Sequence, residues 1–428
     1  MMELPPKIEK KAFSDALFGK TSEEINLLVD QINEEYDYWD KVKHKKPLPN
    51  GVTPEMLWSY VKASRLKQYV VIWDKYGIKL CVTSQMQRLC HEFDMLFGNF
   101  WSSGNDSQSA ERKYYLASSL MEEAIYSSKM EGASTTRMVA KEMLRRRKTP
   151  QNKAQQMIVN NYTTIQHIVV HKDEPLTKEG LLYIHRLMTD KTLDNPEDAG
   201  RFRTNNDVVV ANMVEGDIVH TPPAVKEIPE FVTNLCDFFN NDNHRTFIHP
   251  IIKGIIIHFM VAYMHPFVDG NGRTARALFY WYMLKENYKL TEYMSISRVI
   301  ARSKTSYEKS FRHTENDGND MGYFVAYNLR ALEVSFQQLR DYIQRKQREK
   351  KAATVFMKAG NINQRQALVL QWLSEDQNTI FTVKDLQEQF AVSSMTARKD
   401  LSDLVQQGYM EEFAINKVTR GYIKKQEE

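Results

Sequence analysis

Apolar residues recur at three- and four-residue steps along much of the chain, which is the spacing of one buried face of an α-helix. The stretches with this spacing are 110–147, 156–172, 226–242, 250–264 and 273–287. Turn-forming residues are scarce, since the 428 residues include only 17 glycines and 13 prolines. The pattern therefore predicts a mainly α-helical protein.

One central segment departs from the helical pattern. Residues 204–223 read TNNDVVVANMVEGDIVHTPP, in which a β-branched run, the turn-like Glu215-Gly216-Asp217 and a second short run precede two prolines. Short β-branched runs on either side of a glycine-containing turn are typical of a β-hairpin. We therefore expect a hairpin within the helical block.

The C-terminal part follows a different order of elements. A short helix (363–374), the strand-like TIFTV (379–383), a helix (384–390), a helix opening at Ser393 or Ser394, and two strand-like runs around 409–423 follow one another. This is the order of a winged helix-turn-helix. Together with a Pro/Gly interruption at 47–54, a loop at 102–108 and a charged polar helix at 331–352, it predicts four regions. They are an N-terminal helical region (1–105), a central helical block (106–330), a helical linker (331–360) and a winged helix-turn-helix domain (361–428).

The composition adds limits to this picture. The chain is 42% hydrophobic and 26% charged, which suits a folded protein of two or three domains. It has neither a signal-like N-terminus nor an apolar stretch long enough to cross a membrane, so we expect a cytoplasmic protein without a membrane partner. The net charge of +4 gives no argument for nucleic acid. Cys81, Cys90 and Cys236 form no CxxC pair, which argues against a disulfide framework or a cysteine-zinc site.

Residues 265–276, HPFVDGNGRTAR, carry the candidate chemistry between two apolar helices. Gly270 and Gly272 allow a tight turn and a close approach to a ligand, and the free N–H groups of the following helix favour an anion. Arg273 and Arg276 lie three positions apart on one helix face and suit phosphate oxygens. These features predict a polyphosphate site.

Two further residues of this segment indicate a chemical reaction at the site. Asp269 is a carboxylate beside the expected phosphates, and it makes sense if it holds a Mg²⁺ that bridges their oxygens. His265, four residues earlier, can take a proton from an incoming hydroxyl as a neutral imidazole. Each of these residues alone would be typical of an ordinary structural loop. Their combination within twelve positions is much more specific and favours a functional site.

The segment resembles the Fic family signature HPFx(D/E)GNGRxxR at every specified position, and the likeness extends over about 110–330. The resemblance implies a Fic-type helical bundle with a β-hairpin flap and an enzyme, a protein adenylyltransferase, that moves AMP from ATP with Mg²⁺ to a Ser, Thr or Tyr hydroxyl. It implies that His265 is the base, that Asp269 holds the metal, and that a target protein binds residues 204–223 by strand addition. The nucleotide-binding residues that it implies are Gly270, Asn271, Gly272, Arg273, Thr274, Ala275 and Arg276.

Residues 127–132, SSKMEG, match the family's inhibitory pattern (S/T)xxxE(G/N). The resemblance implies a subgroup with an N-terminal inhibitory helix, in which Glu131 pairs with Arg276 and denies it to the γ-phosphate. Without the resemblance, Ser127 and Glu131 are an ordinary i, i+4 pair before a helix-ending glycine.

Several alternatives stay open at this point. His249 and His258 suggest a metal site with His265, but an apolar helix face favours packing, and Tyr307 is either near the adenine or an ordinary packing residue. The enzyme could act mainly as a de-AMPylase, or use GTP, CTP or UTP.

A rival interpretation is a nucleotide-responsive DNA-binding regulator. Residues 361–428 hold eight Lys/Arg against ten Asp/Glu, which gives little surplus for DNA, although Arg398, Lys399, Lys417 and Arg420 are placed for contacts. A protein or a second copy of the chain is the other expected partner of this domain.

Overall fold

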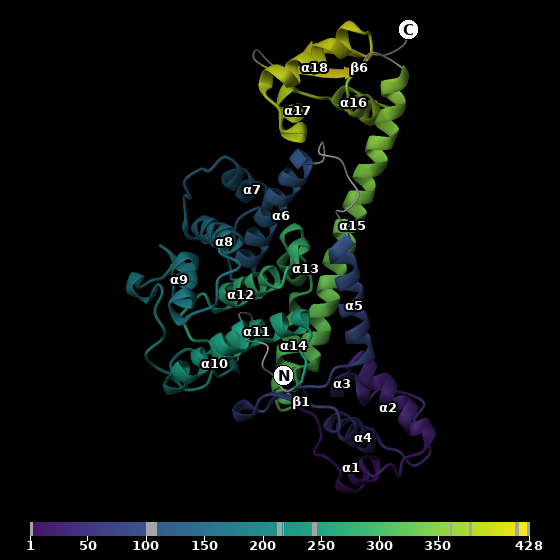
Figure 1. Ribbon diagram of the computed structural model, residues 1–428, viewed down its shortest axis with the longest axis vertical. Coiled ribbons are helices and arrows are strands. Elements are labelled where there is room, and N and C mark those ends of the chain that lie inside the picture. Colours follow the sequence, from purple (N-terminus) through teal and green to yellow (C-terminus); the bar gives the residue numbers. More distant parts are fainter. Residues whose placement is uncertain are drawn as a thin grey trace. The chain divides into compact units, whose positions relative to one another are not determined.

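The computed structural model describes residues 3–99, 109–211, 216, 218–241, 246–359, 362–375, 379–415 and 419–425. The chain divides into two units (Figure 1), one formed by 1–103 with 118–335 and the other by 104–117 with 336–428. The loop expected at 102–108, Glu215 and Asp217 of the expected turn, and Lys417 lie outside the described residues.

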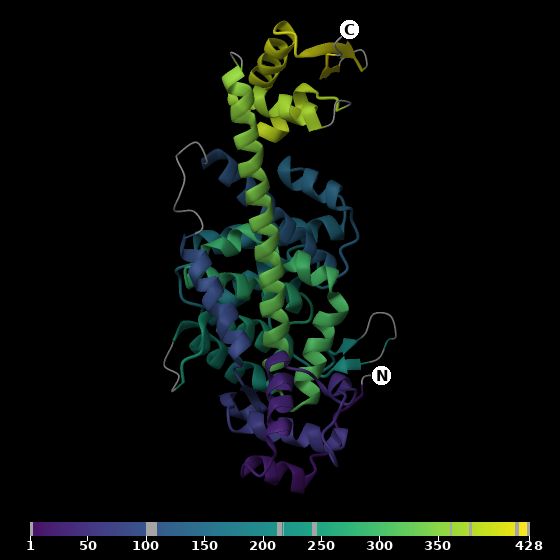
Figure 2. The same ribbon diagram turned by 90° about the vertical axis from the view of Figure 1, so that its right-hand side faces the viewer.

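The N-terminal part of the first unit combines helices with a small hairpin. The helices formed within residues 10–66, purple to dark blue in Figure 2, gather at one end of this unit. The helices of this part are α1 (Lys10–Leu17), α2 (Glu23–Glu35), α3 (Trp39–Val42), α4 (Pro54–Leu66) and α5 (Ser84–Asn99). Strands β1 (Val70–Trp73) and β2 (Ile78–Leu80) pair antiparallel around a turn that ends at Gly77 with φ 63°. The sequence patterns predicted only helices here, because two strands of three or four residues are too short to give a periodic signal.

A buried group of charges ties this part to the central helices. Arg65 of α4 is fully buried, and one of its Nη atoms lies 3.5 Å from Asp320, just before α15. The Tyr69 hydroxyl donates to the same carboxylate at 2.6 Å. Because a buried charge is stable only when it is paired and hydrogen-bonded, removing Arg65 would leave Asp320 with Lys62 at 3.3 Å, and removing Asp320 would leave Arg65 with Asp317 at only 3.8 Å.

The central helices include the ones that the apolar spacing predicted, together with helices at 178–189, 296–302 and 304–316 that lie outside the predicted stretches. They are α6 (Ser109–Met130), α7 (Arg137–Arg145), α8 (Lys153–Val170), α9 (Lys178–Thr189), α10 (Ile228–Asn240), α11 (Pro250–Met264), α12 (Asn271–Lys285), α13 (Ile296–Arg302), α14 (Lys304–Asn316) and α15 (Gly322–Ala359). The stretch 110–147 is interrupted at Gly132, which has φ 91°, and so forms two helices. The polar helix expected at 331–352 is the later part of α15.

Helices α11 and α12 form the core of this unit and lie side by side (Figure 1). Both are apolar or buried around most of their circumference, which is expected of a helix enclosed by others. Gly254 of α11 faces α12, where an added Cβ would lie 3.2 Å from the Tyr282 ring and 3.3 Å from the Phe279 ring. The missing side chain therefore lets the two helices approach closely and fixes the loop that joins them.

The C-terminal unit contains the predicted helix-turn-helix. Its elements are α16 (Gln364–Glu375), α17 (Val383–Phe390), α18 (Ser394–Gln406), β5 (Met410–Ala414) and β6 (Arg420–Lys424). The strand expected at 379–383 is wrong as a full strand: only Phe381 pairs, with Tyr422. Thr382 and Asp385 form a capping box that starts α17 at Val383, and this ends the extended stretch.

The mainly helical fold class with small hairpins is confirmed. In the described part of the chain, no helix combines the length and apolar composition that crossing a membrane requires.

Candidate active site

The segment 265–276 connects the end of α11 to the start of α12. His265 caps α11 in the left-handed conformation (φ 46°), and Gly270 caps α12 with φ 83° and no side-chain hydrogen bond. The Asn271 side chain fixes the loop between them, accepting from the Phe267 N–H at 3.0 Å and donating to the Phe267 carbonyl at 2.9 Å. The first N–H groups of α12 therefore lack a side-chain cap and are available to an anion.

The His265 imidazole is held in one tautomer with a free ring nitrogen. Its Nδ1 faces the Ala262 carbonyl, which can only accept, so Nδ1 carries the proton and Nε2 has the free lone pair. Burial lowers the pKa of His265 to about 4. The ring is thus neutral at ordinary pH.

A buried arginine that the sequence analysis missed holds this end of α11. Arg203 donates to the carbonyls of His265 (2.8 Å), Asn205 (2.9 Å) and Pro223. It therefore joins both ends of the segment expected to form the flap to the main chain of His265. Burial lowers the pKa of Arg203, which among the described residues donates to oxygens of carbonyls and an amide rather than to a carboxylate.

A buried histidine that was also missed supports the loop from α9. His185 Nδ1 accepts from the Gly200 N–H at 3.0 Å, so Nε2 is protonated and donates to the Asp269 carbonyl at 2.8 Å. Its ring stacks on Phe267 with centroids 3.7 Å apart. A Cβ at Gly270 would lie 2.7 Å from Thr189 Cγ2, so α9 also leaves space for glycine alone.

Arg273 carries unused hydrogen-bond donors. One Nη donates to the Met188 carbonyl at 3.0 Å, while Nε and the other Nη are buried and have no hydrogen-bond partner within the described chain. The second Nη lies 3.6 Å from Asp269, too far for a hydrogen bond. Burial lowers the pKa of Arg273. Because buried donors without partners are costly, these atoms fit an anionic ligand, and the half-exposed Asp269 carboxylate is open to a cation beside it.

The second arginine of the motif is already occupied. Arg276 Nη2 donates to Glu131 Oε1 at 2.9 Å and to the Ser127 carbonyl at 2.8 Å, and Nε donates to Ser127 Oγ at 2.9 Å. Burial raises the pKa of Glu131, but Arg276 outweighs it and the net shift is downward. A Cβ at Gly272 would lie 2.3 Å from Glu131 Oε1, so this glycine makes room for the glutamate.

The end of α6 aims Glu131 at the motif. The chain reverses through Gly132 at φ 91°, and the Ala133 N–H bonds back to the Ser128 carbonyl at 3.1 Å, a pattern typical of a helix C-terminus. Ser128 is fully buried and donates to the Met157 carbonyl of α8 at 3.2 Å. These contacts attach the end of α6 to α8.

Tyr307 and His258 form a buried pair, with the Tyr307 hydroxyl 2.8 Å from His258 Nε2. Burial lowers the pKa of His258 to about 3. The two rings pack among Phe311 and Phe324. Within the described ranges, no group of three or more His, Cys, Asp and Glu side chains is arranged to hold a metal ion.

The candidate flap is an antiparallel pair, β3 (Val210–Ala211) with β4 (Ile218–His220), in which Val210 is opposite His220 and Ala211 is opposite Ile218. Val209 and Ile218 are 40% and 62% exposed. The hairpin that the sequence predicted is therefore present, and it leaves apolar side chains accessible next to the motif.

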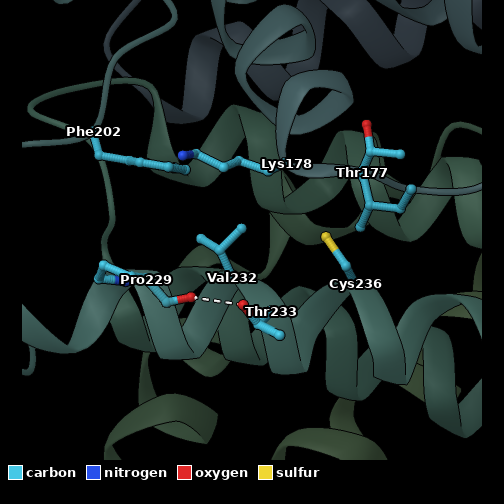
Figure 3. A pocket seen from close by; sticks show the side chains of 8 residues that line it. Thr177, Lys178, Phe202, Pro229, Val232, Thr233 and Cys236 are labelled. Atoms are coloured by element: carbon cyan, nitrogen blue, oxygen red, sulfur yellow. Dashed lines mark hydrogen bonds between the residues drawn. The ribbon is translucent and has the colours of Figure 1, made fainter.

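A cavity of about 460 Å³ lies beside the flap base rather than at the motif (Figure 3). It is lined by the start of α9, by Phe202 and by α10, including Thr233 and Cys236. Phe202 also stacks on Phe267 of the motif loop, with centroids 5.3 Å apart. Phe202 therefore lines the cavity and also packs against the motif loop.

Comparison with known proteins agrees with this geometry. Residues 175–283 match the Fic/DOC family and residues 365–423 match the HTH domain family. The chain is 32% identical over 110 residues to "Protein adenylyltransferase Fic" of Nematostella vectensis, covering 26% of this chain and 23% of that protein. It is 29% identical over 164 residues to "Protein adenylyltransferase fic-1" of Caenorhabditis elegans, covering 38% and 28%. The matches thus span about a quarter of the length of these curated relatives.

A Fic family protein from Desulfovibrio desulfuricans G20 has a similar crystal structure, with a TM-score of 0.54, 18% sequence identity, and coverage of 81% of this chain and 98% of that one. The central helices and the loop between α11 and α12 therefore define a Fic fold. The chain thus contains a region that matches the Fic/DOC family, followed by a region that matches the HTH domain family.

Proposed function

We propose that this protein transfers AMP from ATP to a hydroxyl of a protein target. The observation that carries the proposal is the neutral His265 imidazole, with Nε2 free, at the same loop as a helix N-terminus and two unsatisfied donors of Arg273. A base beside a phosphate-binding loop is what hydroxyl attack on a phosphate needs. The adenylyltransferase names of two relatives point to AMP as the group transferred.

In the proposed reaction, His265 Nε2 takes the proton of a target Ser, Thr or Tyr hydroxyl. The oxygen attacks the α-phosphorus of ATP in line, its bond to phosphorus forms as the bond to the bridging oxygen breaks, and pyrophosphate leaves. The low pKa of His265 keeps the ring neutral for the attack. The left-handed His265 backbone, held by Arg203, keeps the ring at the loop.

The phosphate chain would bind the start of α12 and the free donors of Arg273. We propose Gly270, Asn271 and Gly272 as the main-chain cradle, with Thr274 and Ala275 in the same first turn. Asp269 would hold Mg²⁺, which supplies neutralisation of the phosphate charge when bound. A single carboxylate is enough, because Mg²⁺ takes its other ligands from phosphates and water.

We further propose that Glu131 restrains this reaction. Its carboxylate occupies the Arg276 guanidinium, which would otherwise contact the γ-phosphate. A triphosphate that arrives while the pair is intact meets a neutralised arginine and a carboxylate close to Gly272, so it would bind in a different pose. In a Mg²⁺-bound product complex the same carboxylate could orient a water for removal of AMP, which is the reverse activity left open by the sequence.

Intact-mass measurement tests the proposal. The Glu131→Gly chain is incubated with ATP and Mg²⁺, and a gain of one AMP per modified hydroxyl is expected, with pyrophosphate released. Parallel incubations with GTP, CTP and UTP identify the donor. The Glu131→Gly/His265→Ala chain serves as the matched control and should gain nothing. Absence of nucleotide addition by the Glu131→Gly chain to itself and to cell extract proteins would overturn the assignment.

The second unit supports DNA binding as an additional function. On α18, Arg398 and Lys399 are exposed. Two of the ten acidic residues are engaged within the domain: Asp400 is buried against Arg365, and the Asp385 carboxylate accepts from the Thr382 N–H at the start of α17. The net negative charge of this domain therefore does not describe the outer face of α18, where a recognition helix would meet the major groove. A gel shift with duplex DNA should weaken steeply with salt, whereas a protein partner would give no such band.

A further inference from the structure

A histidine of the flap makes two hydrogen bonds that require both of its ring nitrogens to be donors. His220 Nε2 lies 2.6 Å from the Tyr263 carbonyl, and Nδ1 lies 2.9 Å from Glu315 Oε2. A carbonyl oxygen and a carboxylate oxygen can only accept. His220 is thus an imidazolium in this arrangement, paired with Glu315.

The pair connects three elements around the base. His220 ends β4, Tyr263 lies in the last turn of α11, and Glu315 lies in the last turn of α14. The His220 and Glu315 side chains are only 10% and 21% exposed, so water competes weakly for these bonds. The His220 ring is 6.2 Å from the His265 ring. One side chain therefore fixes the flap strand with respect to the catalytic imidazole.

We propose that His220 is a positioning residue: its ion pair with Glu315 and its bond to the Tyr263 carbonyl hold the target-binding strand in register with His265. The inference rests on the proposed function, because the strand matters for catalysis only if it holds a target hydroxyl. Main-chain pairing along β3 and β4 gives affinity for an extended segment, but it sets no distance to His265 unless the hairpin itself is anchored.

The bonds of His220 to Glu315 and to the Tyr263 carbonyl form the anchor of the flap strand. The groups that face His220 determine how this anchor responds to pH. Among the described residues they are Glu315 from α14 and Tyr263 and His265 from the end of α11, while its strand partner Val210 has no titratable group. Burial opposes the charged ring, but Glu315 outweighs it, so the pKa of His220 is raised. His265 is neutral and adds no repulsion. The anchor should thus be complete below this raised pKa and weaken as pH rises through it.

Amide hydrogen exchange measures how firmly the anchor holds the flap strand, and it does not depend on AMP transfer. In His220→Gln, which retains one donor but no charge, amides within 205–223 should exchange about tenfold faster than in the parent at pH 6.5, the factor expected for loss of a charge-assisted hydrogen bond. Glu315→Gln should have the same effect. Amides of α11 should keep their protection. Glu308→Gln is the matched control, because Glu308 lies on the same helix and forms only an exposed pair with Lys304. Unchanged exchange of the flap in both variants overturns the proposal.

The rate of AMP addition in a Glu131→Gly background then tests the catalytic consequence. The parent rate at saturating ATP should fall as pH rises through the pKa of His220. Glu315→Gln should move this fall to lower pH, and His220→Gln should remove it and be about tenfold slower at pH 6.5, with the ATP concentration for half-maximal rate unchanged. A His220→Gln variant with the parent's rate and pH profile overturns the positioning role. Failure of the Glu131→Gly parent to add AMP is a failure of the proposed function instead, and the exchange experiment then decides the anchor by itself.

Discussion

Glu131 Oε1 lies 2.9 Å from Arg276 Nη2, although 145 positions separate the two residues in the chain. The Arg276 side chain is 5% exposed and that of Glu131 is 33% exposed, so the guanidinium is buried while the carboxylate remains partly open to solvent. Ser127, one helical turn before Glu131, bonds the same guanidinium through its hydroxyl and its carbonyl. The end of α6 thus binds the arginine that a γ-phosphate would need.

Weakening the contact between the end of α6 and Arg276 should raise the rate of AMP addition, and by different amounts in two variants. Glu131→Gly is expected to raise the initial rate of AMP addition by at least about tenfold, the factor given by losing 1.4 kcal/mol of competition at Arg276. Ser127→Ala removes the hydrogen bond from Arg276 Nε to the Ser127 hydroxyl but leaves Glu131 in place, so it should raise the rate by less. Rates come from intact-mass time courses. Glu142→Ala removes a surface partner of Arg146 and should behave like the parent. Equal rates in all four chains contradict the restraint.

His265→Ala should stop transfer without preventing nucleotide binding. Loss of a general base lowers rates by roughly 100-fold or more. The fit to ATP depends on Arg273 and the α12 N-terminus, so ATP with Mg²⁺ should still raise the melting temperature of this variant. His44→Ala, an exposed histidine far along the chain from the motif, is the control. Transfer that persists in His265→Ala refutes the role of the imidazole as base.

Buried neutral histidines should make the protein sensitive to acid. Burial lowers the pKa of His185 to about 4 and that of His258 to about 3, both below the ordinary value of 6.5. The unfolded chain therefore binds more protons in this window, and the unfolding free energy should fall as pH drops from about 6.5 toward 4. The titration of His185 alone should lower the unfolding free energy by on the order of 3 kcal/mol.

Urea unfolding at pH 7.5 and 4.5 measures this dependence. His258→Gln can still bond the Tyr307 hydroxyl but does not titrate, so its unfolding free energy should change less between the two pH values. His44→Gln should follow the parent. A His258→Gln variant that loses as much stability as the parent would show that His258 is not responsible.

Gly270→Ala should destabilise the loop for two separable reasons. The residue has φ 83°, which costs an L-residue about 1–2 kcal/mol, and a Cβ would lie 2.7 Å from Thr189 Cγ2. Gly19→Ala is the matched control, with φ 70° and no atom within 4 Å of the added Cβ. The unfolding free energy should thus fall further in Gly270→Ala than in Gly19→Ala. Equal losses would mean that the contact with α9 relaxes freely.

The contiguous part of the site could be predicted from sequence because its geometry is local. The apolar run that begins at Pro250 and ends before His265-Pro266 predicted the bounds of α11, and the glycines of the motif predicted a tight turn, which Gly270 makes in the left-handed conformation. The serines at 393 and 394 predicted the start of α18, and the structure shows that Ser393 is its N-cap. Each of these features depends on backbone preferences within a few residues, and such preferences are readable from residue type.

The short strands are the elements that local sequence patterns did not predict correctly. TIFTV has a strand-like composition, yet Thr382 caps α17 and leaves a single bridge at Phe381. The hairpin of β1 and β2 was not expected. In both places a few residues could adopt either conformation, and contacts with distant segments selected one.

Sequence alone determined the helical core, the hairpin, and the loop that brings a histidine, a carboxylate and two arginines together. Only the tertiary structure decided which residues hold that loop: Arg203 on the His265 carbonyl, His185 on the Asp269 carbonyl, and His220 between Tyr263 and Glu315. Most of these bonds go to main-chain oxygens. Every residue has such an oxygen, so no pattern of side chains marks which one a distant arginine or histidine will reach, and only the folded packing of the helices selects it.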